Sequence, residues 1–134
     1  MRALVGDLTF LHDIGGLARG RLEPEVDLQV IVLDDGGGTI FATLEHGRPE
    51  HQGTFDRYFA SPQQLAFAAL AAGFGARYAL IEGERALADL ARELVEPVRG
   101  RSVLHVRLDP QTERVRAGEV ERQVAAAVRA ALAG

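Results

Sequence analysis

Short apolar runs alternate along the chain with stretches in which apolar residues recur at helical spacing. The runs consist mainly of aliphatic and β-branched residues, the pattern of strands that are covered on both faces. They lie at residues 3–5, 28–33, 77–81 and 102–108. Helical spacing marks residues 10–18, 61–73, 87–94 and 120–132. Strands that alternate with helices predict an α/β domain, for which we expect three α/β/α layers around a mostly parallel sheet.

The clearest predicted helix start lies at Ser61. Serine is a favoured N-cap residue, Pro62 suits the first helical position, and Gln64 completes a capping box. The residues that follow, up to Gly73, are apolar nearly all round, so we expect this helix to be well buried. The preceding residues 44–59 hold no period, which predicts a long irregular segment of the kind that often carries function.

The composition is that of a folded domain with a single core. The chain has 134 residues, of which 47% are apolar and 25% are charged. Its formal net charge of -4 argues against nucleic acid as the main partner, because phosphate backbones bind clustered cations. It has no cysteine, which excludes disulfides and thiolate metal sites, and no apolar stretch long enough to span a bilayer. We therefore expect a cytoplasmic protein that does not insert into membranes.

Two of the predicted strands end in residues that can hold a metal and a phosphate. The first ends at Gly6-Asp7, before a helix whose N-terminal amides attract anions, and the second ends at Asp34-Asp35 with glycines at 36–38. Three glycines after a buried strand predict a turn in which the backbone closely approaches another group. Since parallel sheets bind ligands beyond their carboxyl ends, a metal–diphosphate unit is one interpretation. Two ordinary turns are the other, because Asp and Gly are common in turns.

The interval between these two segments resembles that of thiamine-diphosphate enzymes, in which a Gly-Asp-Gly motif is followed by Asn-Asn. Residues 5–13, VGDLTFLHD, and residues 34–41, DDGGGTIF, resemble one branch of that superfamily. The branch is the SEPHCHC synthase family, the 2-succinyl-5-enolpyruvyl-6-hydroxy-3-cyclohexene-1-carboxylate synthases of menaquinone biosynthesis. Leu8 is itself typical of the branch. The resemblance is detailed from residue 1 to about residue 82 and rests on the order of elements beyond that.

The resemblance implies a metal site. Asp7 and Asp35 would bind Mg²⁺ or Mn²⁺ through their side chains, and Gly37 would bind it through its backbone carbonyl. Asp35 replaces the Asn that is usual in the family. The replacement adds a negative charge, which favours the cation and disfavours phosphates, and it removes an amide donor.

The resemblance also implies a set of residues around the cofactor, thiamine diphosphate. Leu8 and Thr9 would approach the diphosphate through their backbone N–H groups and the Thr hydroxyl. Ile40 and Phe41 would line the cavity beside the cofactor. The whole cofactor-binding set is then Asp7, Leu8, Thr9, Asp35, Gly37, Ile40 and Phe41.

Members of the family combine a pyrimidine-binding domain, a central domain and a diphosphate-binding domain. The resemblance implies that residues 1–134 are the C-terminal part of the diphosphate-binding domain, truncated at its N-terminal side, with the other two domains absent. The intact enzyme decarboxylates 2-oxoglutarate on thiamine diphosphate and adds the resulting carbanion to isochorismate. Its cofactor lies against the pyrimidine-binding domain of a second subunit, so we expect a homo-oligomer and an inactive isolated chain.

Two other classes of protein stay open on the residues alone. A non-catalytic flavodoxin-like module would bind metal or phosphate through an Asp cluster, but such a domain would carry a functional Lys, and this chain has no lysine. A structural oligomerisation domain is the third hypothesis. Among the histidines, His46 and His51 are candidates for the mouth of the site. His105 lies mid-strand, where we expect it in the core or on the sheet surface.

Overall fold

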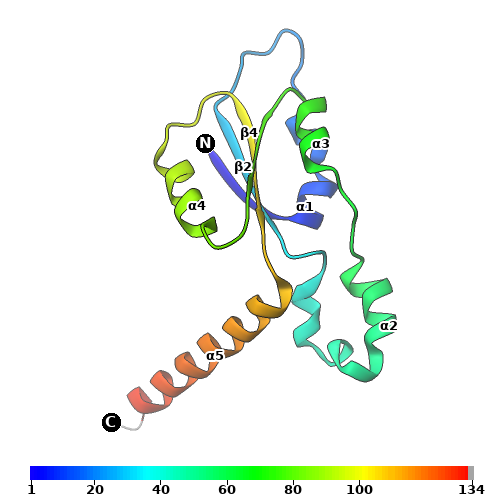
Figure 1. Ribbon diagram of the computed structural model, residues 1–134, viewed down its shortest axis with the longest axis vertical. Helices are drawn as coiled ribbons and strands as arrows, with labels where there is room; N and C mark the ends of the chain where they lie inside the picture. Colours follow the sequence, from blue (N-terminus) through cyan, green and yellow to red (C-terminus); the bar gives the residue numbers. More distant parts are fainter. Residues whose placement is uncertain (133–134) are drawn as a thin grey trace.

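A four-stranded parallel sheet forms the centre of the molecule (Figure 1). The computed structural model describes residues 1–132. Its strands are β1 (Arg2–Gly6), β2 (Leu28–Asp34), β3 (Arg77–Ile81) and β4 (Arg101–Arg107). They lie in the order β1-β2-β4-β3, so β2 and β4 occupy the middle. Both central strands are buried over most of their length, as predicted for strands that are covered on both faces.

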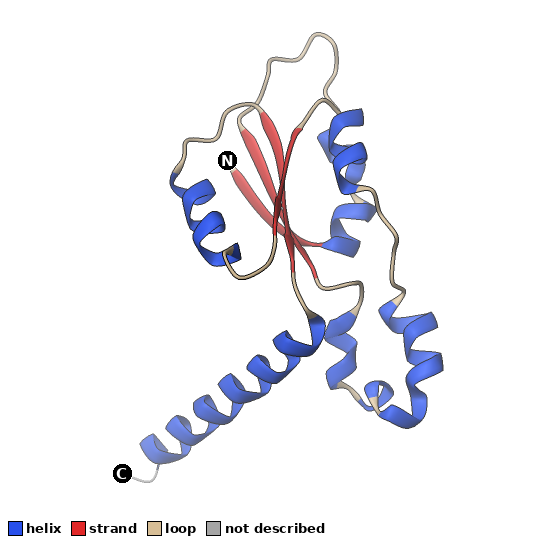
Figure 2. Cartoon of the chain, viewed as in Figure 1, coloured by secondary structure: helices blue, strands red, loops and turns tan. Residues whose placement is uncertain are grey.

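Helices cover both faces of the sheet and form the three-layer α/β/α arrangement that the sequence predicted (Figure 2). α1 (Asp7–His12) and α3 (Phe67–Gly73) lie on one face, and α4 (Ala86–Val95) lies on the other (Figure 1). Because all four strands are parallel, each connection leads the chain back to the end of the sheet at which the strands begin. The four strands therefore share one carboxyl edge.

The core consists of two apolar layers, one on each face of the sheet. The layer under α1 and α3 is built from Phe10, Leu17, Val30, Val32, Phe67, Ala71, Ala76 and Val103. The layer under α4 is built from Ile31, Ile81, Leu104 and Val106. Burial of a larger aliphatic or aromatic side chain contributes about 1.5–3 kcal/mol. These two layers are therefore the main source of stability, and they hold the strand ends in place.

The segment between β2 and α3 consists of short helical turns. They are η2 (Thr39–Thr43), η3 (Glu45–Gly47), η4 (Pro49–His51), α2 (Gln52–Phe55) and the π-helical turn η5 (Asp56–Ala60). Phe55 and Ala60 are buried, and the Phe55 ring stacks on that of Phe59 with centroids 5.9 Å apart. The absence of one regular element over residues 44–59 is as predicted.

The predicted helix start at Ser61 is wrong. Ser61 has a φ of 43°, the left-handed conformation that ends helices, whereas an N-cap residue is extended. Its N–H donates to the Asp56 carbonyl at 3.0 Å, so it closes the η5 turn. Residues 61–66 are not helical, and α3 begins at Phe67. Within α3 only Phe67 and Ala71 are buried, so the prediction of a well-buried helix is also wrong.

The first predicted helix, residues 10–18, divides into two pieces. α1 ends at His12, and a 3-10 helix over Ile14–Leu17 follows it. The division places two glycines, which have low helix propensity, in the tighter second piece. Leu17 still reaches the core at 3% exposure, so the apolar pattern was correct although the single helix was not.

The last helix, α5 (Pro110–Leu132), is longer than predicted and extends away from the sheet (Figure 1). None of its residues is buried. It exposes the aliphatic side chains of Val115, Val120, Val124, Val128 and Leu132. Within residues 1–132, no helix combines the length and the apolar character that crossing a membrane requires.

Candidate metal site at the carboxyl edge of the sheet

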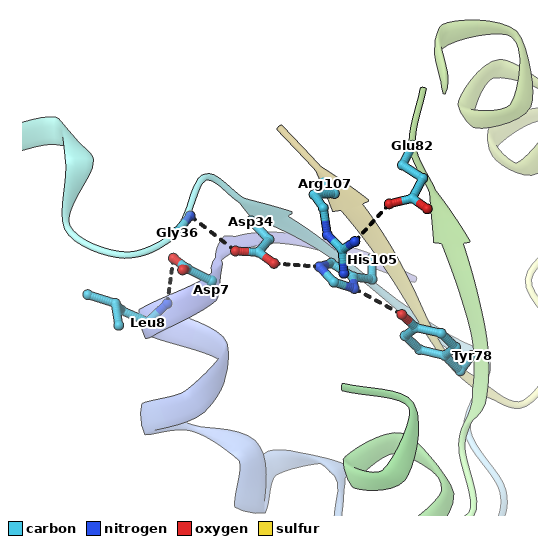
Figure 3. Close-up of polar contacts among 8 residues, drawn as sticks. All are labelled: Asp7, Leu8, Asp34, Gly36, Tyr78, Glu82, His105 and Arg107. Carbon is cyan, nitrogen blue, oxygen red and sulfur yellow. Dashed lines mark hydrogen bonds and ion pairs between the residues drawn. The ribbon is translucent and has the colours of Figure 1, made fainter. Parts of the chain in front are cut away.

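The carboxyl ends of β1 and β2 lie side by side. Their register pairs Gly6 with Leu33, so the residues that follow, Asp7 and Asp34, meet where the two strands end (Figure 3). The charges of Asp34 and Asp35 both act on Asp7. The two acidic segments that the sequence singled out therefore form one acidic edge, in the place where parallel sheets bind ligands.

Asp7 is the most enclosed carboxylate of this edge, with 6% of its surface exposed. Its Oδ1 accepts the Leu8 N–H at 2.8 Å. Burial raises the pKa of Asp7, the hydrogen bond from Leu8 opposes the rise, and the charges of Asp34 and Asp35 add to it. The ionised form of Asp7 is thus energetically disfavoured in the folded chain, and a bound cation would stabilise it.

Thr39 connects two of the predicted metal ligands. Its hydroxyl donates to the Asp35 carboxylate, and its N–H donates to the Gly37 carbonyl at 2.9 Å. No role was predicted for Thr39 from the sequence, although it lies within the segment DDGGGTIF. A hydroxyl four residues after an acid is the signal that points to such a turn, because Ser and Thr often bond to nearby turn groups.

The glycine turn packs against the chain itself. Gly37 has a φ of 125°, and a Cβ at this position would lie 2.1 Å from the Ala60 carbonyl oxygen. A Cβ on Gly38 would lie 2.2 Å from the Phe59 carbonyl oxygen, and the Gly38 N–H donates to Ala60 at 2.7 Å. The close backbone approach predicted from the three glycines is confirmed. The η5 turn is the neighbour that requires it.

Asp34 is held by a side chain of the adjacent strand, β4. Its Oδ2 is 2.7 Å from Nε2 of His105 on β4, and Nδ1 of His105 is 2.9 Å from the Tyr78 hydroxyl on β3 (Figure 3). His105 is 1% exposed, which confirms the core position as one of the two expected for it. Its contact with the acidic turn was not predicted, because a sequence does not show which strands are neighbours.

Leu8, Thr9 and Ile40, which were also predicted to contact the cofactor, lie in different surroundings near this edge. The Leu8 N–H is taken by Asp7, and Thr9 lines an apolar hollow of about 170 Å³ beside Val5. Ile40 is 75% exposed and lines a second hollow of about 250 Å³ together with Asp35. The structure thus brings Ile40 to the hollow beside Asp35 and places Thr9 at a different hollow, between α1 and the strands β1 and β2.

Phe41 lies next to Ile40 on η2 and is 42% exposed. Its ring packs edge-on against Phe59 with centroids 6.2 Å apart. Of the weaker candidates, His51 is exposed and lies 3.9 Å from Glu50, whereas the His46 side chain is outside what the structure describes.

The donor chemistry of the edge fits a hard divalent cation. Two carboxylates, Asp7 and Asp35, and the Gly37 carbonyl supply only oxygen atoms, and Mg²⁺ commonly takes few protein ligands and completes its shell with water and phosphate. Within residues 1–132 there is no group of three or more His, Cys, Asp or Glu side chains arranged to hold a metal by themselves.

These features define a class: a parallel α/β domain whose carboxyl edge joins acidic side chains to a glycine turn. Comparison with known proteins then identifies its relatives. The chain is 45% identical over 98% of its length to the 2-succinyl-5-enolpyruvyl-6-hydroxy-3-cyclohexene-1-carboxylate synthase of Renibacterium salmoninarum. It is 40% identical over 93% of its length to the synthase of the same name from Paenarthrobacter aurescens. No protein-family model matches the chain.

The chain spans 23% of the length of the first relative and 22% of the second. A third protein of the same name, from an Arthrobacter species, is 39% identical over 98% of the chain. The resemblance that the motifs indicated is therefore confirmed: the chain is similar, over almost its whole length, to a segment of the SEPHCHC synthases.

Proposed function

We propose that the chain is the metal- and diphosphate-binding part of a SEPHCHC synthase. The observation that carries the proposal is the meeting of Asp7 with the Asp34-Asp35 turn at the carboxyl edge. The similarity to SEPHCHC synthases supports it, because the matched segment includes both acidic motifs. The flavodoxin-like and oligomerisation hypotheses lack comparable support.

Asp7 and Asp35 bind Mg²⁺ or Mn²⁺ through carboxylate oxygens in this proposal, and Gly37 binds it through its carbonyl. Asp7 Oδ1 and the Gly37 carbonyl each accept one hydrogen bond in the structure, and both groups retain further lone pairs for a metal. Ile40 and Phe41 supply apolar surface beside the cofactor. Thiamine diphosphate supplies, when bound, the electron sink for decarboxylation and carbon–carbon bond formation.

The negative charge of the edge makes the cation a requirement for diphosphate binding. Arg107, which lies at the same edge, is paired with Glu82 at 2.9 Å (Figure 3). At an effective dielectric constant of 20, two like unit charges about 6 Å apart repel by about 3 kcal/mol. A diphosphate meets several such carboxylates, and Asp35 in place of the usual Asn adds one of them. Asp7 and Asp35 would therefore accept a diphosphate only together with a cation that offsets their charge.

The remaining functions belong to regions that the relatives have beyond the matched segment. We propose that the whole protein decarboxylates 2-oxoglutarate and joins the product to isochorismate. In this proposal a pyrimidine-binding domain of a second subunit completes the cofactor site, which requires a homo-oligomer. The names of the relatives and the 22–23% of their length that the chain spans support this division.

Titration calorimetry of the purified chain with thiamine diphosphate tests the proposed site. We expect heat of binding in the presence of Mg²⁺ or Mn²⁺ and none in the presence of EDTA. Asp7→Ala should abolish the signal, whereas Asp13→Ala, a change at an exposed acid directly after α1, should preserve it. Equal binding in EDTA would refute the metal site. Binding by neither the chain nor the full-length protein would refute the function.

A further inference from the structure

Three polar side chains beside the proposed site form a hydrogen-bonded row that the proposed function does not use. Asp34, His105 and Tyr78 come from three neighbouring strands, β2, β4 and β3 (Figure 3). The side chain of His105 is 2% exposed and that of Asp34 is 17% exposed. The row thus runs from the interior of the sheet to the acidic edge.

The two ring nitrogens of His105 have different partners. An ionised carboxylate only accepts, so Nε2 of His105 carries the proton of the bond to Asp34. Burial raises the pKa of Tyr78, so its hydroxyl keeps its proton, and this hydroxyl lies 2.9 Å from Nδ1 of His105. The Tyr78 hydroxyl, which can donate or accept, thus holds the ring by the nitrogen that does not face Asp34.

The His105 ring lies among apolar groups. It stacks on Phe67 of α3 with centroids 4.1 Å apart, and Phe67 stacks on Phe10 of α1 at 5.7 Å. In the sheet, His105 is paired with Val32 on one side and with Leu80 on the other. An aliphatic residue would suit this apolar layer, so the imidazole contributes through its two hydrogen bonds.

Asp34 connects His105 to the glycine turn through its two carboxylate oxygens. While Oδ2 is held by His105, Oδ1 accepts the Gly36 N–H at 3.1 Å. Both oxygens of Asp34 are therefore engaged, one on the interior side and one at the start of the turn. Asp35, the next residue, is bonded instead to Thr39 and faces the hollow that Ile40 lines. The two adjacent acids have separate tasks in this arrangement.

We propose that His105 is a positioning residue: it fixes the Asp34 carboxylate, and through Asp34 it fixes the turn at residues 35–38 that carries the proposed metal ligands. Tyr78 orients the imidazole for this task. The inference rests on the proposed function for its purpose and on the hydrogen bonds of the row for its geometry. Asp34 is then a support of the site, and no metal ligand.

Two measurements on the purified chain test the proposal separately from the metal site. The first, without metal, compares backbone amide NMR resonances of residues 35–39 in wild type and in His105→Leu, which keeps the apolar packing and removes both hydrogen bonds. We expect these resonances to shift and broaden. The second measures Mn²⁺ affinity from the electron paramagnetic resonance signal of the free ion. Loss of a supporting hydrogen bond typically weakens metal affinity about 10- to 100-fold, and we expect a loss in that range.

Matched variants separate positioning from general stability. His105→Gln retains an N–H that can reach Asp34, so it should recover part of the Mn²⁺ affinity that His105→Leu loses. Arg92→Gln, at an exposed residue of α4 outside the row, should change neither measurement. If His105→Leu does not fold, Asp34→Ala serves in its place, because Asp34 lies at the surface end of the row and its loss should release the Gly36 N–H.

The outcomes are distinguishable. Unchanged resonances over residues 35–39 in a folded His105→Leu or Asp34→Ala chain overturn the positioning role, whatever happens to Mn²⁺. A wild-type chain and full-length protein that bind no Mn²⁺ overturn the proposed function, and the resonances then decide the positioning role alone. Altered resonances with unchanged Mn²⁺ affinity overturn the link between the row and the metal site.

Discussion

Replacing Asp7 with Asn removes one charge from the acidic edge and keeps an oxygen that can accept the Leu8 N–H, which Asp7 Oδ1 accepts at 2.8 Å. Asp7 is 6% exposed, and burial is the largest cause of its raised pKa. The hydrogen bond from Leu8 lowers the pKa, and the charges of Asp34 and Asp35 raise it further. Because Asp34 and Asp35 are only partly buried, solvent screens their repulsion, and we expect Asp7→Asn to stabilise the metal-free chain by about 1 kcal/mol at pH 7.

The sign of the pH dependence follows from the raised pKa. Above the unfolded pKa of about 3.9, the ionised Asp7 of the folded chain is disfavoured, so wild type is destabilised relative to Asp7→Asn. As the pH falls through the folded pKa and then below the unfolded value, Asp7 is protonated in both states and the difference disappears. Stability would be measured by urea unfolding followed by circular dichroism, across this range and in EDTA.

Mg²⁺ should reverse the ranking at pH 7. An ion that binds only the folded state at 100 times its Kd adds about 2.7 kcal/mol, which wild type gains and Asp7→Asn largely lacks. Asp13→Asn is the control and should show neither the gain in EDTA nor the loss of the metal effect. A metal-free Asp7→Asn chain that is less stable than wild type at pH 7 would refute the electrostatic reasoning.

Three further predictions concern the turn, the core and the activity. Gly37→Ala should destabilise the chain by about 3 kcal/mol in urea unfolding, because its Cβ would lie 2.1 Å from the Ala60 carbonyl oxygen and its φ is left-handed. Gly53→Ala is the control: a Cβ there meets nothing within 4 Å, so stability should change by less than about 0.5 kcal/mol. Val32→Ala should cost about 2 kcal/mol, since Val32 is 0% exposed, whereas Val115→Ala at 70% exposure should be close to neutral in the same assay. The isolated chain should release no CO₂ from 2-oxoglutarate with thiamine diphosphate and Mg²⁺, and turnover above the cofactor blank would contradict the proposed division of the enzyme.

The strands and the acidic edge were predictable because their signals are local. β2 and β4 carry nearly continuous apolar runs, which only a doubly covered strand tolerates, and both were placed to within one residue at each end. Once the strands are parallel, the residues that follow them must share an edge, and Asp7 and Asp34 meet for that reason.

The errors arose where tertiary contacts outweigh local preference. Ser61-Pro62-Gln63-Gln64 has the residues of a helix start, but the preceding η5 turn already uses the Ser61 N–H, and its left-handed φ excludes the extended conformation that a cap needs. The row from Tyr78 to Asp34 was not predictable either. It depends on β4 lying between β2 and β3, an order that chain sequence and apolar pattern do not reveal.

The acidic edge also explains why adjacent aspartates are tolerated at positions 34 and 35. Two neighbouring carboxylates beside a third would repel strongly if all three faced one point. Here Asp34 is bonded to His105 and the Gly36 N–H, and Asp35 is bonded to the Thr39 hydroxyl. Each therefore has its own donor, whereas Asp7, which accepts the Leu8 N–H, also experiences the charges of Asp34 and Asp35. A cation that enters this edge gains most from Asp7, so loss of Asp7 should impair metal binding more than loss of Asp34.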